Sequence, residues 1–563
     1  MVIDGAAHPL DRDGDGYFAG VVASARAGSL YRFRLDDERD TYPDPASRFQ
    51  PEGPHGPSMV VDPSRYRWHD AAWRGVSSKG TVLYEMHIGT YTAEGTWSAA
   101  IEHLGELREI GITAIEVMPV NEFAGRFGWG YDGVAIWAPF HHYGTPDDFR
   151  AFVDAAHATG LGVILDVVYN HFGPDGCYLA KFSDSWFTER ANEWGQQVNF
   201  DDDGVRAFVS ENAGYWIEEF HLDGLRIDAT QSIADDRPMH IVCLVTQRAR
   251  EAAGERTIYV AAENEPQRVE MIARDGLDAM WNDDWHHSAM VAATGRREAY
   301  YTDYFGRPQE FISMAKHGFL YQGQHYRWQK NRRGTPALRL PPEQLVCYLQ
   351  NHDQIANSAS GRRLHQLTTP GRFRALTALL LLGPNTPLLF QGEELGSPAP
   401  FLYFADHKPE LAKEVSKGRR EFLSQFPSIA AVKDLAPPED EATFTVCKLD
   451  HDAYDEKVLA LHRDLLRLRR DRAFATLVDG AVLGDEAFVL RYEQRLLIIN
   501  LGRDQELSIV PEPLLAPPEG KSSWTLLWSS ESEKYGGGGT AAVEREDGWR
   551  IPGHAAVVMG TED

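Results

Sequence analysis

The pattern of hydrophobic and polar positions changes twice along the chain. Over residues 1–75, short apolar runs are separated by turn residues, and in Ser29–Leu35 apolar positions alternate with polar ones. Period-two alternation predicts β-strands. A proline-rich segment, Tyr42–Pro57, follows these runs, and prolines at that density exclude regular secondary structure. We therefore expect residues 1–75 to form a small N-terminal β-sandwich.

From residue 76 to residue 470, apolar runs alternate with stretches that have helical spacing. The helical stretches are Ser98–Ile110, Pro146–Thr159, Val205–Phe220, Arg372–Leu382 and Glu456–Arg470. The apolar runs are Val82–Ile88, Ala114–Pro119, Gly162–Tyr169, Phe220–Thr230, Thr257–Ala262, Ala279–Asp283, Leu345–Gln350 and Pro387–Gln391. Eight apolar strands that alternate with helices predict an α/β fold, the (β/α)8 TIM barrel.

Two long insertions interrupt the barrel pattern. Phe172–Asp203 follows the third strand and is rich in Asp, Gly and aromatic residues, whereas Ala299–Pro342 lies between the sixth and seventh strands and is rich in Tyr, Trp and Arg. Loops of this length in a barrel either serve a function or are poorly ordered. Because disordered segments contain few aromatic residues, we expect both insertions to be functional lids.

Alternation with a period of two returns in residues 471–563. It covers Ala487–Tyr492, Leu496–Leu501, Ser523–Leu527 and Ala555–Met559, with turns at Gly536–Gly539 and at Asp547–Gly548. This pattern predicts a C-terminal antiparallel β domain. The expected domains are therefore residues 1–75, 76–470 and 471–563.

Charge and cysteine content narrow the choice of partners and compartment. The chain has 56 Lys and Arg against 83 Asp and Glu, a net charge of −27, which argues against nucleic acid and against an anionic membrane surface. The net negative charge would neither attract nor repel a neutral ligand such as a sugar. The four cysteines show no C-x-x-C spacing, and we interpret them as reduced packing residues. Since no signal peptide or membrane-spanning run is found, we expect a cytoplasmic location.

Ionisable residues gather at the carboxyl ends of the predicted strands, where barrel enzymes place their chemistry. A single acid at such a position is often only a helix cap or an ion-pair partner, but several on one rim favour catalysis. They are Asp166 and His171 after the third strand, Arg226 and Asp228 on the fourth, Glu263 on the fifth, and His352 and Asp353 on the seventh.

Two of these carboxyl groups suit the cleavage of a glycosidic bond, which needs one acid to attack the sugar and one to protonate the leaving oxygen. Arg226 precedes Asp228 by two residues, on the same face of the strand, so it would keep Asp228 ionised and suited to attack. Glu263 follows three apolar residues and has no neighbouring cation in the sequence. We therefore expect a raised pKa and a proton-donating role for Glu263.

Four short motifs, D-V-V-Y-N-H, G-L-R-I-D-A, A-A-E-N and N-H-D, resemble the four regions of the α-amylase superfamily of glycoside hydrolases, in the same order. The resemblance implies a retaining mechanism with Asp228 as nucleophile, Glu263 as general acid/base and Asp353 as a third acid that binds sugar hydroxyls. Tyr131, in F-G-W-G-Y-D-G, matches the aromatic residue that stacks on the sugar. The implied substrate-binding and supporting residues are Trp129, Tyr131, Asp166, His171, Arg226 and His352.

Longer strings are similar to one subgroup of that superfamily, the maltooligosyltrehalose trehalohydrolases. They include Y-E-M-H-I-G-T-Y-T-A-E-G-T-W, W-N-D-D-W-H-H, Y-L-Q-N-H-D-Q-I-A-N and L-L-F-Q-G-E-E. This likeness implies hydrolysis of the α-1,4 bond next to a terminal α,α-trehalose, release of trehalose, and functional pairing with a maltooligosyltrehalose synthase. No cofactor is expected. The N-terminal β domain, which we expect to resemble carbohydrate-binding domains, is shorter than that of the subgroup.

Other functions within and beyond this chemistry stay open. A glucan-branching transferase or an ordinary α-amylase would share the architecture, although branching enzymes usually carry Ser and Glu where this chain has Asn351 and Gln354. A non-catalytic glucan-binding relative would typically have lost one of the three acids. All three are present here.

Two neighbouring stretches are candidates for the trehalose end of the site. The aromatic insertion contributes Tyr300, Tyr301, Tyr304, Tyr326 and Trp328, and the end of the sixth strand contributes Asp283, Asp284, Trp285 and His286. The hypothesis is that these residues line the part of the site that binds trehalose. For any one of the aromatic residues, packing of the loop on the barrel is an equally good interpretation.

A metal ion is the last candidate. Many α-amylases bind a structural calcium through the residue that matches Asn170, and Asp175, Asp184 and Asp201–Asp203 could supply further oxygens. Acidic loops are more often simply solvated, and the subgroup is not known for a calcium requirement. We expect no metal.

Overall fold

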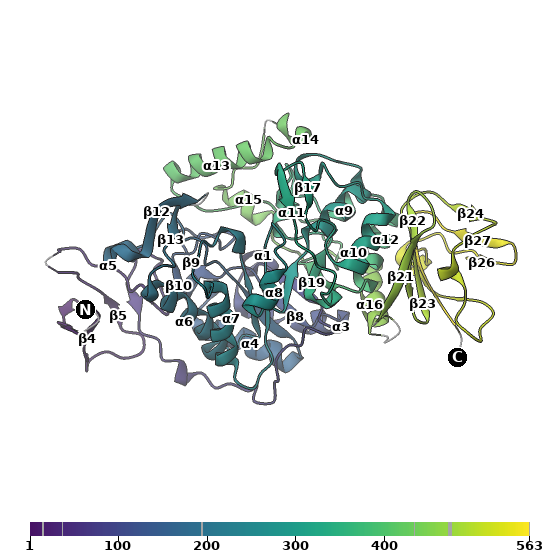
Figure 1. The fold of residues 1–563 in the computed structure, drawn as a ribbon. Coiled ribbons are helices and arrows are strands. Elements are labelled where there is room, and N and C mark those ends of the chain that lie inside the picture. Colours follow the sequence, from purple (N-terminus) through teal and green to yellow (C-terminus); the bar gives the residue numbers. More distant parts are fainter. Residues whose placement is uncertain are drawn as a thin grey trace.

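Three regions follow one another along the long axis of the molecule: a small N-terminal sheet, a central barrel and a C-terminal region of β-strands (Figure 1). The structure is a computed structural model that describes residues 1–13, 16–36, 38–192, 195–432, 434–470, 474 and 476–561. Within these ranges, no helix is both long and apolar enough to cross a lipid bilayer.

Eight parallel strands close into a barrel, which confirms the predicted fold. All of their residues are buried, because each strand faces the barrel interior on one side and helices on the other. This explains why the sequence shows continuous apolar runs here rather than alternation. The strands are β7 (Leu83–Met86), β8 (Ala114–Val117), β11 (Gly162–Val167), β14 (Gly224–Ile227), β15 (Tyr259–Ala262), β16 (Ala279–Trp281), β19 (Leu345–Tyr348) and β20 (Thr386–Phe390).

Helices cover the outside of the barrel. Helix α4 (Pro146–Thr159) has the predicted bounds, because Thr145 and Asp148 form a capping box at its start and Gly160 ends it with a left-handed φ of +84°. The other long helices of this layer are α6 (Asp203–Glu219), α7 (Ile241–Ala253), α9 (Asp283–Thr294), α12 (Pro370–Leu382) and α16 (Glu456–Arg469).

One predicted helix is in fact two. The stretch Ser98–Ile110 forms α2 (Trp97–Ile101) and α3 (Leu104–Ile110), joined by a turn at Glu102 and His103, whose backbone angles stay in the right-handed region. Leu104, Leu107 and Ile110 of α3 are nevertheless buried, as their spacing predicts. The hydrophobic period is thus the same for one helix as for two short helices whose buried faces point the same way.

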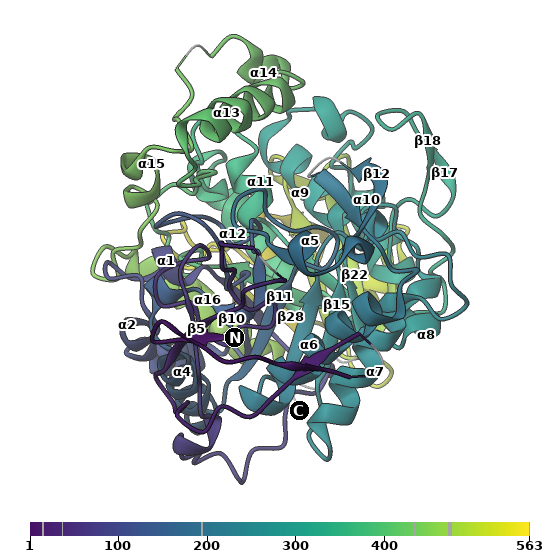
Figure 2. The ribbon, with the colours of Figure 1, turned by 90° about the vertical axis from the view of Figure 1, so that its left-hand side faces the viewer.

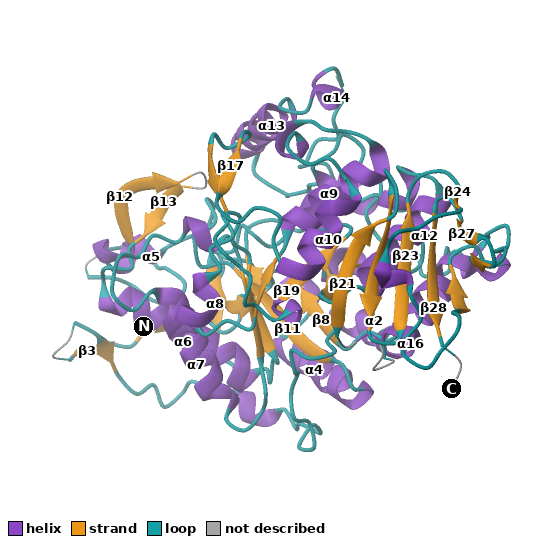
Figure 3. Cartoon of the chain, turned by 45° about the vertical axis from the view of Figure 1, so that its right-hand side comes forward, coloured by secondary structure: helices purple, strands orange, loops and turns teal. Residues whose placement is uncertain are grey.

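Both long insertions contain secondary structure that the sequence pattern did not predict. The first holds α5 (Leu179–Phe182) and a hairpin of β12 (Phe187–Asn192) and β13 (Gly195–Val198); the second holds α10 (Pro308–His317) and a hairpin of β17 (Gln324–Tyr326) and β18 (Asn331–Arg333). A further helix, α13 (Pro409–Leu423), follows β20. Both hairpins and α13 lie at the upper side of the molecule in Figure 3.

The C-terminal region consists of two antiparallel sheets. One has five strands in the order β21-β22-β23-β28-β25, namely Leu477–Val482, Ala487–Tyr492, Arg495–Asn500, Ala555–Gly560 and Thr525–Ser529. The other has three, in the order β24-β27-β26 (Gln505–Leu507, Gly548–Ile551 and Glu544–Arg545). Alternate residues of β22 face opposite ways: Phe488 belongs to the barrel-side core, where it stacks on Phe311 of α10, and Val489 belongs to the core between the sheets.

The N-terminal region differs from the sandwich that the sequence suggested. Among the described residues it forms one antiparallel sheet, in the order β2-β1-β5-β6 (Ala6–Ala7, Val2–Ile3, Leu30–Arg32 and Ser58–Met59), and a separate hairpin of β3 (Asp11–Arg12) and β4 (Phe18–Ala19). Strands of two or three residues bury too little apolar surface to hold a second layer. The region lies at one end of the barrel, where the purple ribbon faces the viewer in Figure 2.

Candidate active site

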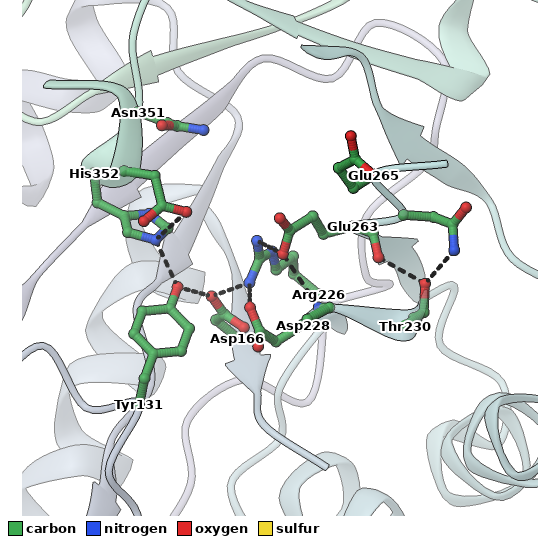
Figure 4. Close-up of polar contacts among 12 residues, drawn as sticks. Tyr131, Asp166, Arg226, Asp228, Thr230, Glu263, Glu265, Asn351 and His352 are labelled. Atoms are coloured by element: carbon green, nitrogen blue, oxygen red, sulfur yellow. Dashed lines mark hydrogen bonds and ion pairs between the residues drawn. The ribbon is translucent and has the colours of Figure 1, made fainter. Parts of the chain in front are cut away.

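A buried arginine joins three acids at the carboxyl end of the barrel (Figure 4). Arg226, on β14, donates from Nη1 to Asp166 Oδ2 at 2.8 Å and to Asp228 Oδ1 at 2.6 Å. Its Nη2 donates to Glu263 Oε2 at 2.8 Å. Parallel register causes this convergence, because Asp166 pairs with Arg226 across β11 and β14 and their side chains point the same way. The guanidinium also lies over the ring of Trp281, 4.3 Å from its centroid.

The backbone after Asp228 holds Glu263 in place. Ala229 has a left-handed φ of +39°, an uncommon conformation for a residue with a side chain, and its N–H donates to Glu263 Oε2 at 3.1 Å. Thr230 donates from its hydroxyl to the carbonyl oxygen of Glu263 at 2.6 Å. Strained backbone of this kind is found where a site fixes its groups precisely enough to offset the cost. Here it fixes Glu263 relative to Asp228.

Strand pairing also needs a small residue at the start of β14. A side chain at Gly224 would place its Cβ 1.8 Å from the carbonyl oxygen of Tyr259 on β15. The glycine of G-L-R-I-D therefore allows β14 and β15 to approach closely enough to place Arg226 beside Glu263.

Burial raises the pKa of both candidate catalytic carboxyls. It raises the pKa of Glu263 to about 7, even though the Arg226 guanidinium opposes the shift and the nearby Asp228 and Asp353 charges add to it. Burial also raises the pKa of Asp228, against the opposing charge of Arg226. The predicted direction for Glu263 is thus found, and its largest cause is burial, as the apolar residues before Glu263 suggested. Glu263 does have a neighbouring cation, which lies on the adjacent strand and not beside it in sequence.

A second set of contacts links the seventh strand to this cluster. Tyr131 donates from its hydroxyl to Asp166 Oδ2 at 2.7 Å, and the same hydroxyl lies 2.9 Å from His352 Nε2 (Figure 4). The rings of Tyr131 and His352 stack with centroids 5.2 Å apart. Asp353 follows His352 at the start of α11 (His352–Ala356), and its carboxylate, 44% exposed, lies 3.5 Å from His352 Nε2. Among the acids expected to take part in catalysis, Asp228, Glu263 and Asp353, the carboxyl group of Asp353 is the most open to a ligand.

Two other predicted residues, Trp129 and His171, are buried. Trp129 is 5% exposed, donates from its indole N–H to the carbonyl of Leu402, and meets the His352 ring edge-on. It supports His352 and is not an open sugar platform. His171 lies with its Nε2 2.9 Å from the backbone carbonyl of Tyr131. Both therefore act on the site through a neighbour.

Asn170 contributes to the site in a way that the sequence did not predict. Its amide nitrogen donates to Asp228 Oδ2 at 2.9 Å, and its amide oxygen contacts His171 Nδ1. An amide that faces a carboxylate with its nitrogen presents no oxygen there for calcium. Of the other suggested ligands, Asp175 pairs with Lys408, and Asp202 caps α6. These residues do not fit a calcium site.

One group in the described part of the chain has ligand atoms close enough to hold a metal. It consists of Glu106 on α3 together with His103 and His451, which lie in turns outside the helices. The imidazole rings stack at 3.6 Å with a 15° interplanar angle. Lone pairs in two parallel ring planes do not converge on one ion, so this arrangement is a ring contact.

The residues predicted for the trehalose end divide into two groups. Asp283 lies at the rim, 19% exposed; burial raises its pKa to about 7 against Arg333, and the Tyr348 hydroxyl donates to it. Tyr301, 7% exposed, donates to Gln354. Five other predicted residues are buried in the packing of the loop on the barrel, which argues against the expected contact with sugar: Asp284, Trp285, His286, Tyr304 and Tyr326. Asp284 pairs with Arg333, Trp285 packs on Phe311, and Tyr326 donates to the Tyr300 carbonyl.

The comparisons with known proteins agree with this geometry. The family model for the alpha amylase catalytic domain matches residues 67–196, and a model for a domain of unknown function matches residues 475–558. The chain is 40% identical over 549 residues to the malto-oligosyltrehalose trehalohydrolase of Deinococcus radiodurans, covering 93% of this chain and 90% of that one. The chain belongs to the malto-oligosyltrehalose trehalohydrolase family.

Further matches describe the range of this family and its neighbours. The malto-oligosyltrehalose trehalohydrolase of Saccharolobus solfataricus is 38% identical, over 84% of this chain and 83% of its own. A 1,4-alpha-glucan branching enzyme of Pseudoalteromonas atlantica is 31% identical over only 41% of this chain. A crystal structure of an alpha-amylase candidate from Salmonella typhimurium superposes with a TM-score of 0.88 and 36% identity, over 99% of this chain and 95% of that one.

Proposed function

We propose that the chain is a retaining glycoside hydrolase that cleaves the α-1,4-glucosidic bond next to the terminal α,α-trehalose of a maltooligosyltrehalose and releases trehalose. The observation that supports this most strongly is the set of three acids around Arg226, in a chain that matches the trehalohydrolase of Deinococcus radiodurans over nearly its full length. Similar identity to the branching enzyme extends over less than half of the chain.

In the first step, Asp228 attacks the anomeric carbon of the glucose unit on the glycone side of the bond. Glu263 gives its proton to the leaving oxygen, so trehalose departs with an intact hydroxyl and a covalent glycosyl–Asp228 ester remains. The raised pKa of Glu263, about 7, keeps a proton available for this transfer near neutral pH. Asn170 and Arg226, which donate to the two Asp228 oxygens, aim the attacking carboxylate.

In the second step, Glu263 acts as a base. It removes a proton from water as the water oxygen attacks the anomeric carbon, the ester bond breaks, and Asp228 leaves as a carboxylate. Two displacements at one carbon return the α configuration. Asp353, exposed beside His352, would bind the sugar hydroxyls and strengthen that contact as charge develops on the ring.

For the trehalose end we propose the rim residue Asp283, which the buried Arg333 helps to position. Arg333, on β18, bonds Glu265 and Asp284, and its Nη2 lies 3.8 Å from Asp283 Oδ2. A partly exposed carboxyl group such as that of Asp283 can bind the hydroxyls of a kinked disaccharide that lacks a free anomeric hydroxyl. A partner enzyme of the synthase type, which converts the reducing end of a maltooligosaccharide to trehalose, would supply the substrate.

Chromatography of products from two matched substrates tests the proposal. Maltotriosyltrehalose should yield trehalose and maltotriose, whereas maltopentaose, which has the same number of glucose units, should react far more slowly. Equal cleavage of both would indicate an ordinary α-amylase, and products longer than the substrate would indicate a transferase.

A further inference from the structure

A buried carboxylate that has no part in the proposed mechanism contacts His352. Glu85, in the first barrel strand β7, is 1% exposed. Its Oε1 lies 2.5 Å from His352 Nδ1, and its Oε2 accepts the backbone N–H of His352 at 3.1 Å. Both oxygens of Glu85 therefore contact a residue 267 positions away. No role for Glu85 follows from the proposed mechanism.

The contacts at Nε2 of His352 determine whether this nitrogen donates or accepts a hydrogen bond. The Tyr131 hydroxyl has one hydrogen and two neighbours, Asp166 Oδ2 at 2.7 Å and His352 Nε2 at 2.9 Å. Asp166 Oδ2 also accepts a hydrogen bond from the Arg226 guanidinium, which favours the carboxylate form of Asp166. Asp166 Oδ2 therefore accepts the hydrogen of the Tyr131 hydroxyl. The bond between Tyr131 and His352 is then satisfied only if Nε2 carries a hydrogen of its own.

The same reasoning applies at Nδ1, where a carboxylate oxygen at 2.5 Å requires a donor. With hydrogens on both ring nitrogens, Nδ1–H donates to Glu85, Nε2–H donates to Tyr131, and the tyrosine hydroxyl donates to Asp166. We propose that Glu85 is a positioning residue that keeps His352 doubly protonated and so directs a cationic N–H toward Tyr131 and Asp353 at the sugar-binding rim.

The charges around His352 favour this state on balance. Burial alone would lower the pKa of His352, but the Asp353 and Glu85 carboxylates raise it to about 9. Arg226 opposes them. The titratable and charged groups that face the imidazole are Glu85 on β7, His87 just after it, Glu116 on β8, Tyr131, Asp166 on β11, Arg226 on β14 and Asp353 on α11.

The consequence for catalysis rests on the proposed function. A cationic His352 beside Asp353 orients that carboxylate and places a donor at the rim where sugar hydroxyls bind. Without Glu85 the imidazole would lose a proton at a lower pH, Nε2 would become an acceptor, and the Tyr131 hydroxyl would turn from Asp166 to His352. The defect should therefore grow as pH rises and shrink as pH falls.

The test uses the full chain labelled with 15N-histidine, with the His352 signals assigned by their loss in His352→Gln. In the parent protein both His352 ring nitrogens should carry hydrogens at pH 8. In Glu85→Gln, which keeps the shape but removes the charge, the pKa of His352 should fall by about 1–3 units, the usual effect of one nearby opposite charge. Glu116→Gln is the matched control. Burial raises the pKa of Glu116 well above its ordinary value, so replacing Glu116 by Gln should change the charge near His352, and hence the pKa of His352, only a little.

Activity on maltotriosyltrehalose supplies a second measurement that a purely structural role would not reproduce. The ratio of kcat in Glu85→Gln to kcat in the parent should rise as pH falls from 8 to 5.5. A neutral His352 at pH 8 in the parent, or an unchanged His352 titration in Glu85→Gln, would overturn the proposal, as would a ratio that does not vary with pH. The titration needs no substrate, so failure of the proposed hydrolase function would be recognised separately, as an absence of trehalose release.

Discussion

Arg226 Nη2 lies 2.8 Å from Glu263 Oε2, so the group proposed as the proton donor is bonded to the same guanidinium as the proposed nucleophile. The two acids therefore share one cation, and a change of charge on either is felt by the other. When Asp228 becomes an ester it loses its negative charge, which otherwise raises the pKa of Glu263. The pKa of Glu263 then falls, and Glu263 becomes the carboxylate that the second step requires as a base.

This coupling predicts the effect of Asp228→Asn, which imitates the uncharged ester. We expect kcat to fall by several orders of magnitude because the nucleophile is lost. Tm should stay close to that of the parent, because Asp166 and Asp228 together outweigh the charge of Arg226 and the variant reduces this excess negative charge. The pKa of Glu263 should fall below the parent value of about 7. Infrared titration of the carboxyl groups measures that pKa, with Asp283→Asn as a control for the other rim acid. Activity near the parent level would refute the role of Asp228.

The raised pKa of Glu263 predicts the pH dependence of kcat/KM. The proton donor works in its protonated form, so activity should be lost as pH rises through about 7. The nucleophile works as a carboxylate, so activity should also be lost at low pH as Asp228 is protonated. A bell-shaped profile is expected, measured on maltotriosyltrehalose. In Glu263→Gln the residual activity should lack the alkaline limb; a limb that persists there must belong to another group.

The division of the trehalose-side residues into rim and buried groups predicts two kinds of variant. Asp283→Asn should raise the rate on maltopentaose relative to maltotriosyltrehalose, because it removes a polar group proposed to bind trehalose. Trp285→Phe, within the core, should lower Tm and leave that ratio unchanged, since its side chain packs on Phe311. Competition between the two substrates measures the ratio directly. If Asp283→Asn does not change it, the trehalose end lies elsewhere.

The engagement of Asn170 with Asp228 and His171 predicts that calcium is not required. Dialysis against a chelator should leave both kcat and Tm unchanged, and added calcium should restore nothing. A fall in Tm that calcium reverses would show that acidic residues of the chain do bind the ion.

Much of this architecture could be predicted from the sequence because barrel strands are buried on both faces. Their apolar runs, and the acids that end them, are enough to place Asp166, Asp228, Glu263 and Asp353 on one rim. The contacts between strands could not be predicted in this way. Arg226 reaches Glu263 across 37 residues, and Glu85 reaches His352 across 267, so neither pairing leaves a local pattern.

The loops were predicted least well. Burial of Trp285 and Tyr326 depends on how β17, β18 and α10 fold back on the barrel, and aromatic content is the same for a residue that packs and one that binds a sugar. The N-terminal sandwich was expected because alternation identifies strands but does not report how much surface they bury together. In the described residues, the very short strands there form one four-stranded sheet and a separate two-stranded hairpin.

In the proposed mechanism, Asp228 and Glu263 carry out two successive displacements at one anomeric carbon. This mechanism is tested most directly by 1H NMR of maltotriosyltrehalose during the first minutes of reaction, before the new reducing end mutarotates. Trehalose and the α-anomer of maltotriose should rise together in equal amounts, and the β-anomer should follow later. Initial release of the β-anomer would contradict the mechanism.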